Sequence, residues 1–332
     1  MNAREHPLRV AVVGAGGAGG YFAACWALAG LEVTVVARGA HLDAIRARGL
    51  RVESPHGAFV TRPRAVSTLA EIGATDLIML ATKTWQLQTL LDQLPTIDPA
   101  VPIFGVQNGV ESVDRLGTVR DAHTVLGATC RIIAFKQEPG SIRHVGADPS
   151  LRFGEPDGGL SQRVVSLQRA LDASPRLEVL AAPDIRREIW RKFLFFAPLS
   201  GVGSLTRAPI GVVREHGPTR DLLERAMLEV QDLADACGID LGRAAIAETL
   251  AFVDSLPAAG TSSLQRDVEA GRRTELDALS GAVTRLGHEH GVPTPVHELI
   301  TRALEPLELR ARGELAWPLV EDRIEADEED DR

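Results

Sequence analysis

The first half of the chain alternates short apolar runs with longer segments of helical periodicity. The apolar runs are rich in β-branched residues and bounded by turn residues: Leu8–Val13, Val33–Ala37, Asp76–Ala81 and Pro102–Val106. Helical patterns fall between them, at Ala18–Ala29, His41–Arg48 and Trp85–Leu94. Because the runs are apolar throughout instead of alternating with polar residues, they predict strands covered on both faces. Repeated strand–helix units of this kind predict a parallel, doubly wound sheet with right-handed crossovers.

Between Thr124 and Gly154 the pattern changes to short runs separated by glycines. Arg131–Phe135 and Ser141–Val145 are two such runs, and they predict antiparallel hairpins. A helix at Ser161–Leu171 and a strand at Leu177–Ala181 complete this part of the chain.

A long helical pattern follows Pro183 and continues from Asp184 almost to Leu319. We therefore predict an α/β chain in which a Rossmann-type doubly wound sheet domain, residues 1–183, precedes an all-helical C-terminal domain, residues 184–318. The last residues, 319–332, are acidic and have almost nothing apolar to bury, so we expect a solvated and disordered tail.

Composition and charge narrow the class of protein. The 332 residues are 45% hydrophobic and 24% charged, which is typical of a soluble globular chain with room for two domains. The net charge of -9 is partly located in the tail, and the rest of the chain is close to balanced. We therefore expect neither nucleic acid nor an anionic membrane as a partner. No segment reaches the roughly 18 apolar residues of a membrane helix.

The three cysteines, Cys25, Cys130 and Cys237, are far apart and include no Cys-x-x-Cys pair. This spacing argues against a disulfide framework and against a zinc site, and it favours the reducing cytoplasm. His288 and His290 are two residues apart and would not share a helix face as ligands, so we expect no metal.

A glycine-rich turn follows the first predicted strand. Gly14, Gly16 and Gly19 have the spacing G-x-G-x-x-G: the first makes the tight turn, the second lets a pyrophosphate approach the backbone, and the third lets helix and strand pack closely. The amide groups at the start of the following helix then bind the phosphates. The alternative is a plain strand–turn–helix without a ligand, but the position after a strand and before a helix favours a dinucleotide site.

The second predicted strand ends in Arg38, about 20 residues beyond the glycines. An acidic residue there would hold the ribose 2′-hydroxyl of NAD. A guanidinium can instead pair with a 2′-phosphate, so Arg38 favours NADP (NADPH) over NAD, although a surface arginine at a strand end is the simpler alternative.

Two further residues follow predicted strands at the edge of the sheet where ligands bind. Lys83 follows the strand Asp76–Ala81, and we expect it on the phosphate side of the cofactor. Asn108 follows the strand Pro102–Val106, and we expect it near the nicotinamide or the substrate. An ordinary Asn-Gly turn at Asn108-Gly109 is an equally good interpretation.

Lys192 begins a helix whose neighbouring positions are apolar. On a helix it lies beside Ile189, Phe195 and Phe196, where a buried ammonium is costly unless it has a function or reaches water. Such a lysine suits a general acid, and Pro198 is expected to end or kink the helix near a cleft. From the residues alone, a lysine that extends to solvent is the better interpretation.

A polar segment near the end of the chain contains two more candidates. Ser262 or Ser263 suits a helix cap with Gln265 as its partner, and Glu275 suits a first-turn acid before an apolar helix. Spacing alone assigns neither residue to chemistry.

Taken together, these motifs resemble the ketopantoate reductases (2-dehydropantoate 2-reductases). The resemblance extends from about residue 8 to about residue 318. It rests on Gly-Ala-Gly-Gly-Ala-Gly, Val-Ala-Arg-Gly, Lys-Thr-Trp-Gln, Gln-Asn-Gly, Trp-Arg-Lys-Phe and Ser-Ser-Leu-Gln-Arg-Asp…Arg-Arg-Thr-Glu-Leu-Asp.

The resemblance implies a role for each matching residue. Arg38 would contact the NADP 2′-phosphate, and Lys83 and Asn108 would contact the cofactor or the active site. Lys192 would be the general acid. Ser263 and Glu275 would hold the carboxylate and hydroxyl ends of the substrate, and Glu275 would also belong to the catalytic group.

Two positions depart from the family's pattern. Known members have asparagines four and eight residues after the lysine, where this chain has Phe196 and Ser200. Ser200 remains a candidate substrate contact, but the change opens the way to a 2-oxo acid other than ketopantoate.

We therefore expect a cytoplasmic enzyme that uses NADPH to reduce a small-molecule 2-oxo acid, ketopantoate first, in a cleft between its domains. The alternatives are a related reductase, such as a 3-hydroxy acid or opine-type dehydrogenase, and a non-catalytic NADPH-binding regulator. The sequence is compatible with a homodimer and does not determine the oligomeric state.

Overall fold

The computed structural model describes residues 6–317, so the predicted acidic tail at 319–332 lies outside the described residues. The chain divides into two compact units. The first comprises Met1–Phe193 with Ile239–Leu241, and the second, which we call the helical unit, comprises Leu194–Gly238 with Gly242–Arg332. The predicted boundary at Pro183 lies just before α6 (Ile185–Thr206), whereas the division between the units falls inside that helix.

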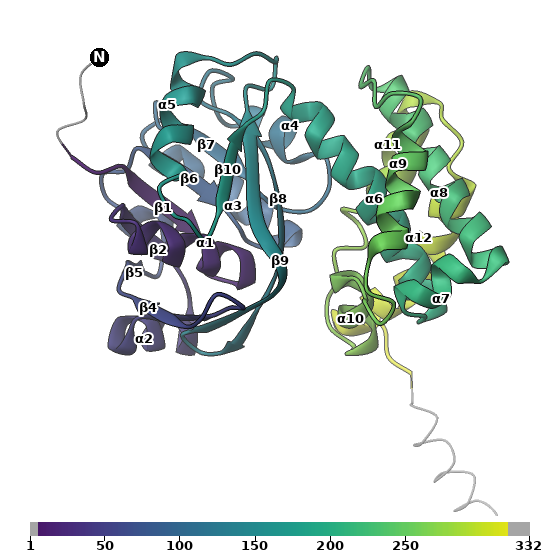
Figure 1. Cartoon of the computed structure of the whole chain (residues 1–332), viewed down its shortest axis with the longest axis horizontal. Helices are drawn as coiled ribbons and strands as arrows, with labels where there is room; N and C mark the ends of the chain where they lie inside the picture. The colour runs from purple at the N-terminus through teal and green to yellow at the C-terminus, as the bar shows by residue number, and fades with distance from the viewer. Residues whose placement is uncertain (1–5, 318–332) are drawn as a thin grey trace, which may run out of the picture. The chain divides into compact units, whose positions relative to one another are not determined.

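The first unit contains a five-stranded parallel sheet (Figure 1). Its strands, in spatial order, are β5 (Arg64–Val66), β2 (Glu32–Val36), β1 (Arg9–Val13), β6 (Leu77–Leu80) and β7 (Ile103–Gly105). All four neighbouring pairs are parallel. The chain adds strands on one side of β1 and then on the other, which confirms the predicted doubly wound sheet. The order reverses beside β1, where folds of this type bind ligands at the carboxyl ends of the strands.

A second sheet packs over the first. Its strands are β3 (Leu50–Glu53), β4 (Phe59–Thr61), β8 (Gly127–Glu138), β9 (Ser141–Gly154) and β10 (Glu178–Ala181). The long strand β9 pairs antiparallel with β8, and parallel with β3 near its start and β10 near its end. The predicted antiparallel hairpin is confirmed, with longer strands than the short apolar runs indicated.

The helix α1 (Gly17–Leu28) lies between these two sheets. A Cβ atom at Gly17 would overlap the carbonyl oxygen of Ala134 in β8, and one at Gly20 would stand 2.8 Å from the Ile142 side chain in β9. On the side of the parallel sheet, a Cβ atom at Gly19 would overlap the carbonyl oxygen of Gly14. Glycine therefore lets both sheets approach the first turns of this helix.

The remaining helices of the first unit are short. They are α2 (Gly39–Arg48), α3 (Leu87–Leu91), α4 (Ser112–Gly117) and α5 (Gln162–Leu171), with 3-10 turns at Leu69–Glu71, Thr84–Gln86 and Leu94–Thr96. The helix predicted at Trp85–Leu94 is reduced to α3 between two 3-10 turns. At its end Leu94 precedes Pro95, and a residue before proline is disfavoured in α-helical geometry.

The helical unit contains the rest of α6 and six further helices among its described residues. These are α7 (Ile210–Glu215), α8 (Gly217–Ala236), α9 (Ala245–Ser255), α10 (Ser263–Glu269), α11 (Ser280–His290) and α12 (Pro295–Ala311). The first turn of α12 is held by a charged side chain from another helix. The carboxylate of Glu229 in α8 accepts hydrogen bonds from the amides of Val296 and His297 at the start of α12, at 2.6 and 3.0 Å.

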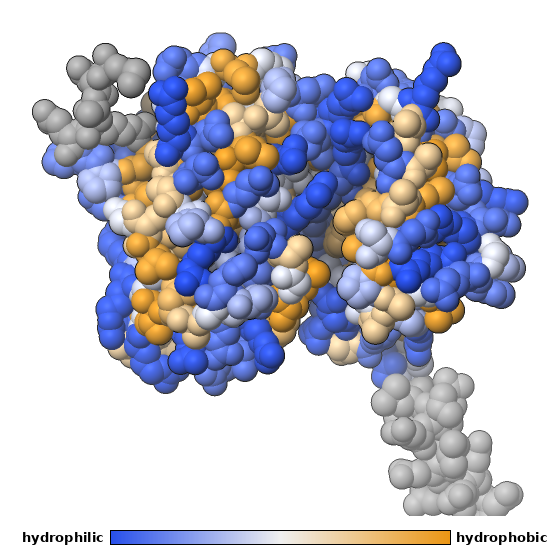
Figure 2. Space-filling view, viewed as in Figure 1, coloured by the Kyte–Doolittle hydropathy of each residue, from blue (hydrophilic) through white to orange (hydrophobic). Residues whose placement is uncertain are grey.

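The helix α6 continues to Thr206 through Pro198, so an end of the helix there is wrong, while the alternative, a kink at Pro198, stays a prediction. A proline inside a helix costs about 3 kcal/mol because it lacks the amide hydrogen and crowds the preceding turn. Around Pro198 the residues Leu194, Ala197 and Leu199 are buried, and this packing outweighs the local cost. On the face of the molecule in Figure 2, hydrophilic residues are interspersed with smaller hydrophobic patches.

Candidate active site

The glycine-rich turn connects the carboxyl end of β1 to α1. Gly14 has φ +101°, and a Cβ atom there would stand 2.9 Å from the amide nitrogen of Thr82, which follows β6. Both the backbone conformation and the close approach therefore require glycine at this position. The Gly14 amide donates to the carbonyl of Val36 at 3.1 Å, so the turn is fixed to the end of β2.

Gly16 differs from its neighbours in the turn because it faces open space. It is the N-cap of α1, and a Cβ atom built on it would meet no atom within 4 Å. The first amides of a helix have no partners within the helix, and the positive end of the helix dipole lies there. The space beside Gly16 is therefore open to an anionic group, whereas the side-chain positions of Gly14 and Gly19 are occupied by neighbouring atoms.

Arg38 follows β2 directly and is the N-cap residue of α2. Its side chain is exposed, and no side-chain hydrogen bond or ion pair involves it within residues 6–317. Because β1 and β2 pair in register, with Val13 opposite Val36, Arg38 and the glycine turn lie at the same edge of the sheet.

Lys83 and Asn108 lie at that same edge, after β6 and β7. Lys83 begins the 3-10 turn Thr84–Gln86, and its Nζ lies 5.5 Å from the centre of the Trp85 ring. Asn108 is half-buried and precedes Gly109, whose φ of +95° is typical of a tight turn.

The Lys192 side chain reaches the Asn108 turn. Its Nζ donates a hydrogen bond to Oδ1 of Asn108 at 3.2 Å, across 84 positions of sequence, and both residues belong to the first unit. Lys192 as a whole is half-buried in α6 instead of fully exposed. It also lies close enough to the fully buried thiol of Cys130 to lower that group's pKa, although burial is the larger effect and raises the pKa overall.

The other candidate residues belong to the helical unit. Ser263 is the first residue of α10, while Ser262 is the helix cap: its hydroxyl accepts from the amide of Gln265 at 3.0 Å, as its sequence position predicts. The Gln265 side chain does not return to the cap and instead donates to the carbonyl of Ala208 at 3.3 Å and to Glu269 at 3.0 Å.

Glu275 is buried in a turn that precedes α11, not in the first turn of the helix. Its neighbour Thr274 fixes this turn, because the Thr274 amide and hydroxyl both donate to Glu308 of α12 at 2.7 Å. The carbonyl of Glu275 accepts from the amides of Ala278 and Leu279, each at 3.1 Å. The backbone that bears the Glu275 side chain is therefore held in a defined place.

The two positions that depart from the family's pattern have different surroundings. Ser200 is fully buried, and its hydroxyl has no hydrogen-bond partner among the described residues. Phe196 is half-buried beside Phe195, with 6.4 Å between ring centres, and the Phe195 ring stands edge-on to Phe252 at 5.0 Å. Aromatic surface thus replaces an amide one turn after Lys192.

Sequence reasoning missed His41 of α2, which bonds to the glycine turn. Its Nε2 lies 2.7 Å from the carbonyl oxygen of Ala15. One signal was present: His41 lies four residues before Ile45, on the buried face of the helix, where an apolar residue is usual.

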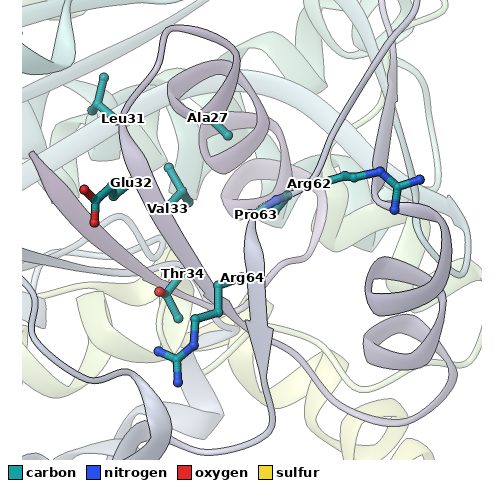
Figure 3. Close-up of a pocket in the computed structure, with 8 residues that line it drawn as sticks. All are labelled: Ala27, Leu31, Glu32, Val33, Thr34, Arg62, Pro63 and Arg64. Atoms are coloured by element: carbon teal, nitrogen blue, oxygen red, sulfur yellow. The ribbon is translucent and has the colours of Figure 1, made fainter. Parts of the chain in front are cut away.

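A hollow of about 360 Å³ lies at the opposite edge of the parallel sheet, between the end of α1 and the starts of β2 and β5 (Figure 3). There the carboxylate of Glu32 and the guanidinium of Arg62 point away from each other. None of the predicted site residues lines this hollow. Among the described residues, no group of three acidic, histidine or cysteine side chains could hold a metal, and no helix is long and apolar enough to cross a membrane.

Comparison with known proteins identifies the family. Residues 10–158 match the family model "Ketopantoate reductase PanE/ApbA", and residues 184–308 match "Ketopantoate reductase PanE/ApbA C terminal". A 2-dehydropantoate 2-reductase of Mesorhizobium japonicum is 33% identical over 318 residues, which cover 88% of this chain and 95% of that protein.

Solved structures agree with this relation. The crystal structure of 2-dehydropantoate 2-reductase from Geobacter metallireducens superposes with a TM-score of 0.83 at 26% identity, covering 90% of this chain and 99% of the other. A D-mandelate dehydrogenase with NADH and anilino(oxo)acetate shares the fold, with a TM-score of 0.83 at 20% identity over 92% of this chain and 99% of the other. The chain therefore belongs to the ketopantoate reductase family and is a 2-dehydropantoate 2-reductase-like oxidoreductase.

Proposed function

We propose that this enzyme uses NADPH to reduce a 2-oxo acid to a 2-hydroxy acid in the cytoplasm. The first candidate reaction is 2-dehydropantoate (ketopantoate) to pantoate, which would place it in pantothenate and coenzyme A biosynthesis. The observation on which we rely most is the hydrogen bond between Lys192 and Asn108, because it joins a cationic donor to the ligand-binding edge of the sheet.

The first unit suits a phosphorylated dinucleotide. The open space at Gly16 accommodates a pyrophosphate against the amides of α1, and the exposed guanidinium of Arg38 suits a 2′-phosphate at the same edge. Gly14 and Gly19 shape the turn, and Lys83 lies on the phosphate side. When bound, NADPH supplies the hydride.

Lys192 acts as the general acid in this proposal. Its Nζ donates a proton to the oxygen of the substrate carbonyl, and its positive charge stabilises the negative charge that develops there. Asn108 orients the ammonium through its Oδ1 atom. An ammonium has three N–H groups, so a bond to Asn108 is compatible with a second bond to a substrate oxygen.

Ser263 and Glu275 orient the substrate. Ser263 does not serve as the cap of α10, because Ser262 has that role, so its hydroxyl suits the substrate carboxylate. The carboxylate of Glu275, on its fixed turn, suits the hydroxyl end of the product. The Ser200 hydroxyl is fully buried, which makes it the least accessible of the proposed substrate contacts.

The aromatic group of Phe195, Phe196 and Phe252 favours a second candidate substrate. A phenyl ring in place of the family's amide adds apolar surface and removes a polar anchor, which suits a 2-oxo acid with a larger apolar side chain. The D-mandelate dehydrogenase neighbour has the same fold and fits this alternative.

A substrate panel tests the proposed reaction. NADPH oxidation is followed at constant enzyme concentration with ketopantoate, with branched aliphatic 2-oxo acids and with a phenyl-substituted 2-oxo acid. A kcat/KM for ketopantoate above that for the others supports the pantoate reaction, whereas a preference for the phenyl compound supports the alternative. NADPH binding without turnover of any compound would indicate a regulator instead.

Replacing Lys192 tests the proposed acid. We expect Lys192→Ala to lower kcat by about 10²–10⁴-fold, the usual contribution of a general acid, while the Kd for NADPH stays nearly unchanged. Arg191→Ala is the matched control, since it removes an exposed positive charge from the adjacent position of the same helix. Retained activity in Lys192→Ala would show that another group donates the proton.

A further inference from the structure

His41 connects three segments of the first unit that are far apart in the sequence. It lies in α2, one turn after Arg38. Its Nε2 lies 2.7 Å from the carbonyl oxygen of Ala15, in the glycine turn. Its Nδ1 lies 2.9 Å from the amide nitrogen of Gly140, in the turn between β8 and β9. The side chain is buried, with 8% of its surface exposed.

The two partners determine the protonation of the ring. The Gly140 amide can only donate, so Nδ1 of His41 must be the unprotonated acceptor. The ring hydrogen is therefore on Nε2, from which it is donated to the Ala15 carbonyl. A neutral imidazole satisfies both bonds, whereas a charged ring would place an N–H group against the Gly140 amide.

The Gly140 turn is a firm anchor for this side chain. Its carbonyl accepts from the Arg51 amide of β3 at 2.9 Å. Gly140 has φ +82°, and a Cβ atom there would stand 2.9 Å from the Cβ of Ala44 in α2. The preceding carbonyl, of Pro139, accepts from Arg48 at 3.3 Å. The turn is thus fixed to the second sheet and to α2.

His41 thus connects the Gly140 turn to Ala15, the residue between Gly14 and Gly16. We propose that His41 is a positioning residue for the dinucleotide: it fixes the glycine turn at Ala15 relative to Arg38 and so sets the distance between the two phosphate-binding points. This inference rests on the proposed cofactor site. It predicts that losing the bond to Ala15 weakens cofactor binding more than it slows the chemical step.

Two substitutions separate the two bonds of His41. In His41→Gln the side-chain amide can place a donor near the position of Nε2, and it loses the acceptor for Gly140. In His41→Asn the side-chain oxygen can replace Nδ1 as acceptor, and it loses the donor to Ala15. We expect His41→Asn to raise the Kd and KM for NADPH about 5- to 20-fold, as the loss of one buried hydrogen bond implies, with kcat within about twofold of the wild type. His41→Gln should change the Kd by less than about threefold.

His144→Gln is the matched control. His144 is also buried and bonds a carbonyl, that of Ala147, at 3.0 Å, and its ring packs on Tyr21 of α1 without reaching the glycine turn. The substitution His144→Gln should lower the Tm of the protein but leave the Kd for NADPH unchanged. An unchanged Kd in His41→Asn, or an equal rise in His144→Gln, would reduce His41 to an ordinary structural residue. Failure of the wild-type enzyme to bind NADPH would instead overturn the cofactor site itself, and His41's role with it.

A measurement on the wild type does not depend on the folding of any variant. Nitrogen-15 NMR of the histidine side chains should show His41 as a neutral ring with its hydrogen on Nε2 at pH 7. A ring protonated on Nδ1, or a charged ring, would contradict the bonding on which the proposal rests.

Discussion

The guanidinium of Arg38 is the single side chain from which we infer a preference for NADPH over NADH. Hydrogen bonds to a charged group are worth about 1.5–3 kcal/mol, so we expect Arg38→Ala to raise the KM for NADPH roughly 10- to 100-fold. NADH lacks the 2′-phosphate, and its KM should change little. Steady-state kinetics with both coenzymes, at a saturating concentration of the 2-oxo acid, measure the two effects together.

Arg46→Ala provides the control for this substitution. Arg46 is an exposed arginine two turns further along α2, where it donates to the carbonyl of Ala65 at 3.0 Å. Its loss removes the same charge from the same helix and should not discriminate between the coenzymes. If Arg38→Ala lowered kcat/KM equally for NADPH and NADH, Arg38 would support the structure of this edge of the parallel sheet and would not recognise the 2′-phosphate.

At this scale, position along the chain indicated where some candidate residues lie and could not indicate others. The place of Arg38 after β2 could be predicted, because it follows from the length of a strand–helix–strand unit. The bond between Lys192 and Asn108 was not, because nothing in local sequence relates positions that are 84 residues apart. His41 was also missed, since its two partners are backbone groups and leave no side-chain motif.

The first turn of α1 gives the sharpest test at the scale of secondary structure. Gly16 and Gly17 are adjacent, yet a Cβ atom at Gly16 meets open space while one at Gly17 overlaps the backbone of β8. We expect Gly17→Ala to destabilise the protein by at least about 1–3 kcal/mol, the usual cost of overpacking, because a strand cannot move as a side chain can. Gly16→Ala should leave Tm within a few degrees of the wild type and raise the Kd for NADPH, since the new methyl group occupies the space that the pyrophosphate needs.

Thermal unfolding and NADPH titration of both variants separate these effects, and each variant is the control for the other. A stable Gly17→Ala protein would mean that the second sheet can shift away from α1. Unchanged NADPH binding in Gly16→Ala would mean that the phosphates lie elsewhere.

The elements that the sequence predicted correctly have strong and continuous apolar patterns. The strands β1, β2, β6 and β7 were predicted to within one or two residues because both of their faces are buried. The strands β3, β4 and β5 were missed because they lack a continuous apolar run: β3 alternates buried with exposed or half-buried positions, and β4 and β5 each bury a single residue. Whether α6 ends at Pro198 or continues through it could not be decided from the sequence, because tertiary packing outweighs a local preference there.

Across the whole chain, the residues of the proposed chemistry are divided between the two units. Lys192 and Asn108 belong to the first unit, whereas Ser263 and Glu275 belong to the helical unit. Unfolding of either unit should therefore abolish activity. Conditions that unfold one unit and leave the other folded would test this division.

The helical unit contains a buried histidine that makes its stability depend on pH. His297 is fully buried, with Nε2 donating to the Ala226 carbonyl and Nδ1 accepting from the Ser280 hydroxyl, both at 3.1 Å. Burial lowers its pKa from 6.5 to about 4. Glu229, which caps the same helix, has a pKa raised by burial.

The direction of the effect follows from which state binds the proton. As pH falls from 6.5 to about 4, the unfolded chain takes up a proton at His297 and the folded chain does not, so the free energy of unfolding decreases. For a pKa difference of this size the loss approaches roughly 3 kcal/mol. Glu229 acts in the opposite sense, because the folded state takes up its proton at a higher pH than the unfolded state, and it offsets part of the loss.

We therefore expect the free energy of unfolding of the helical unit, measured by urea denaturation between pH 7 and pH 4, to decrease as the pH is lowered. In His297→Gln this decrease should become smaller, because the replacement has no proton to take up, although its stability at pH 7 is lower through the lost bond to Ser280. His288→Gln, which removes an exposed histidine of α11, should leave the slope unchanged. An equally steep decrease in His297→Gln would assign the pH dependence to other groups, and the carboxylates of the unit would be the next to test.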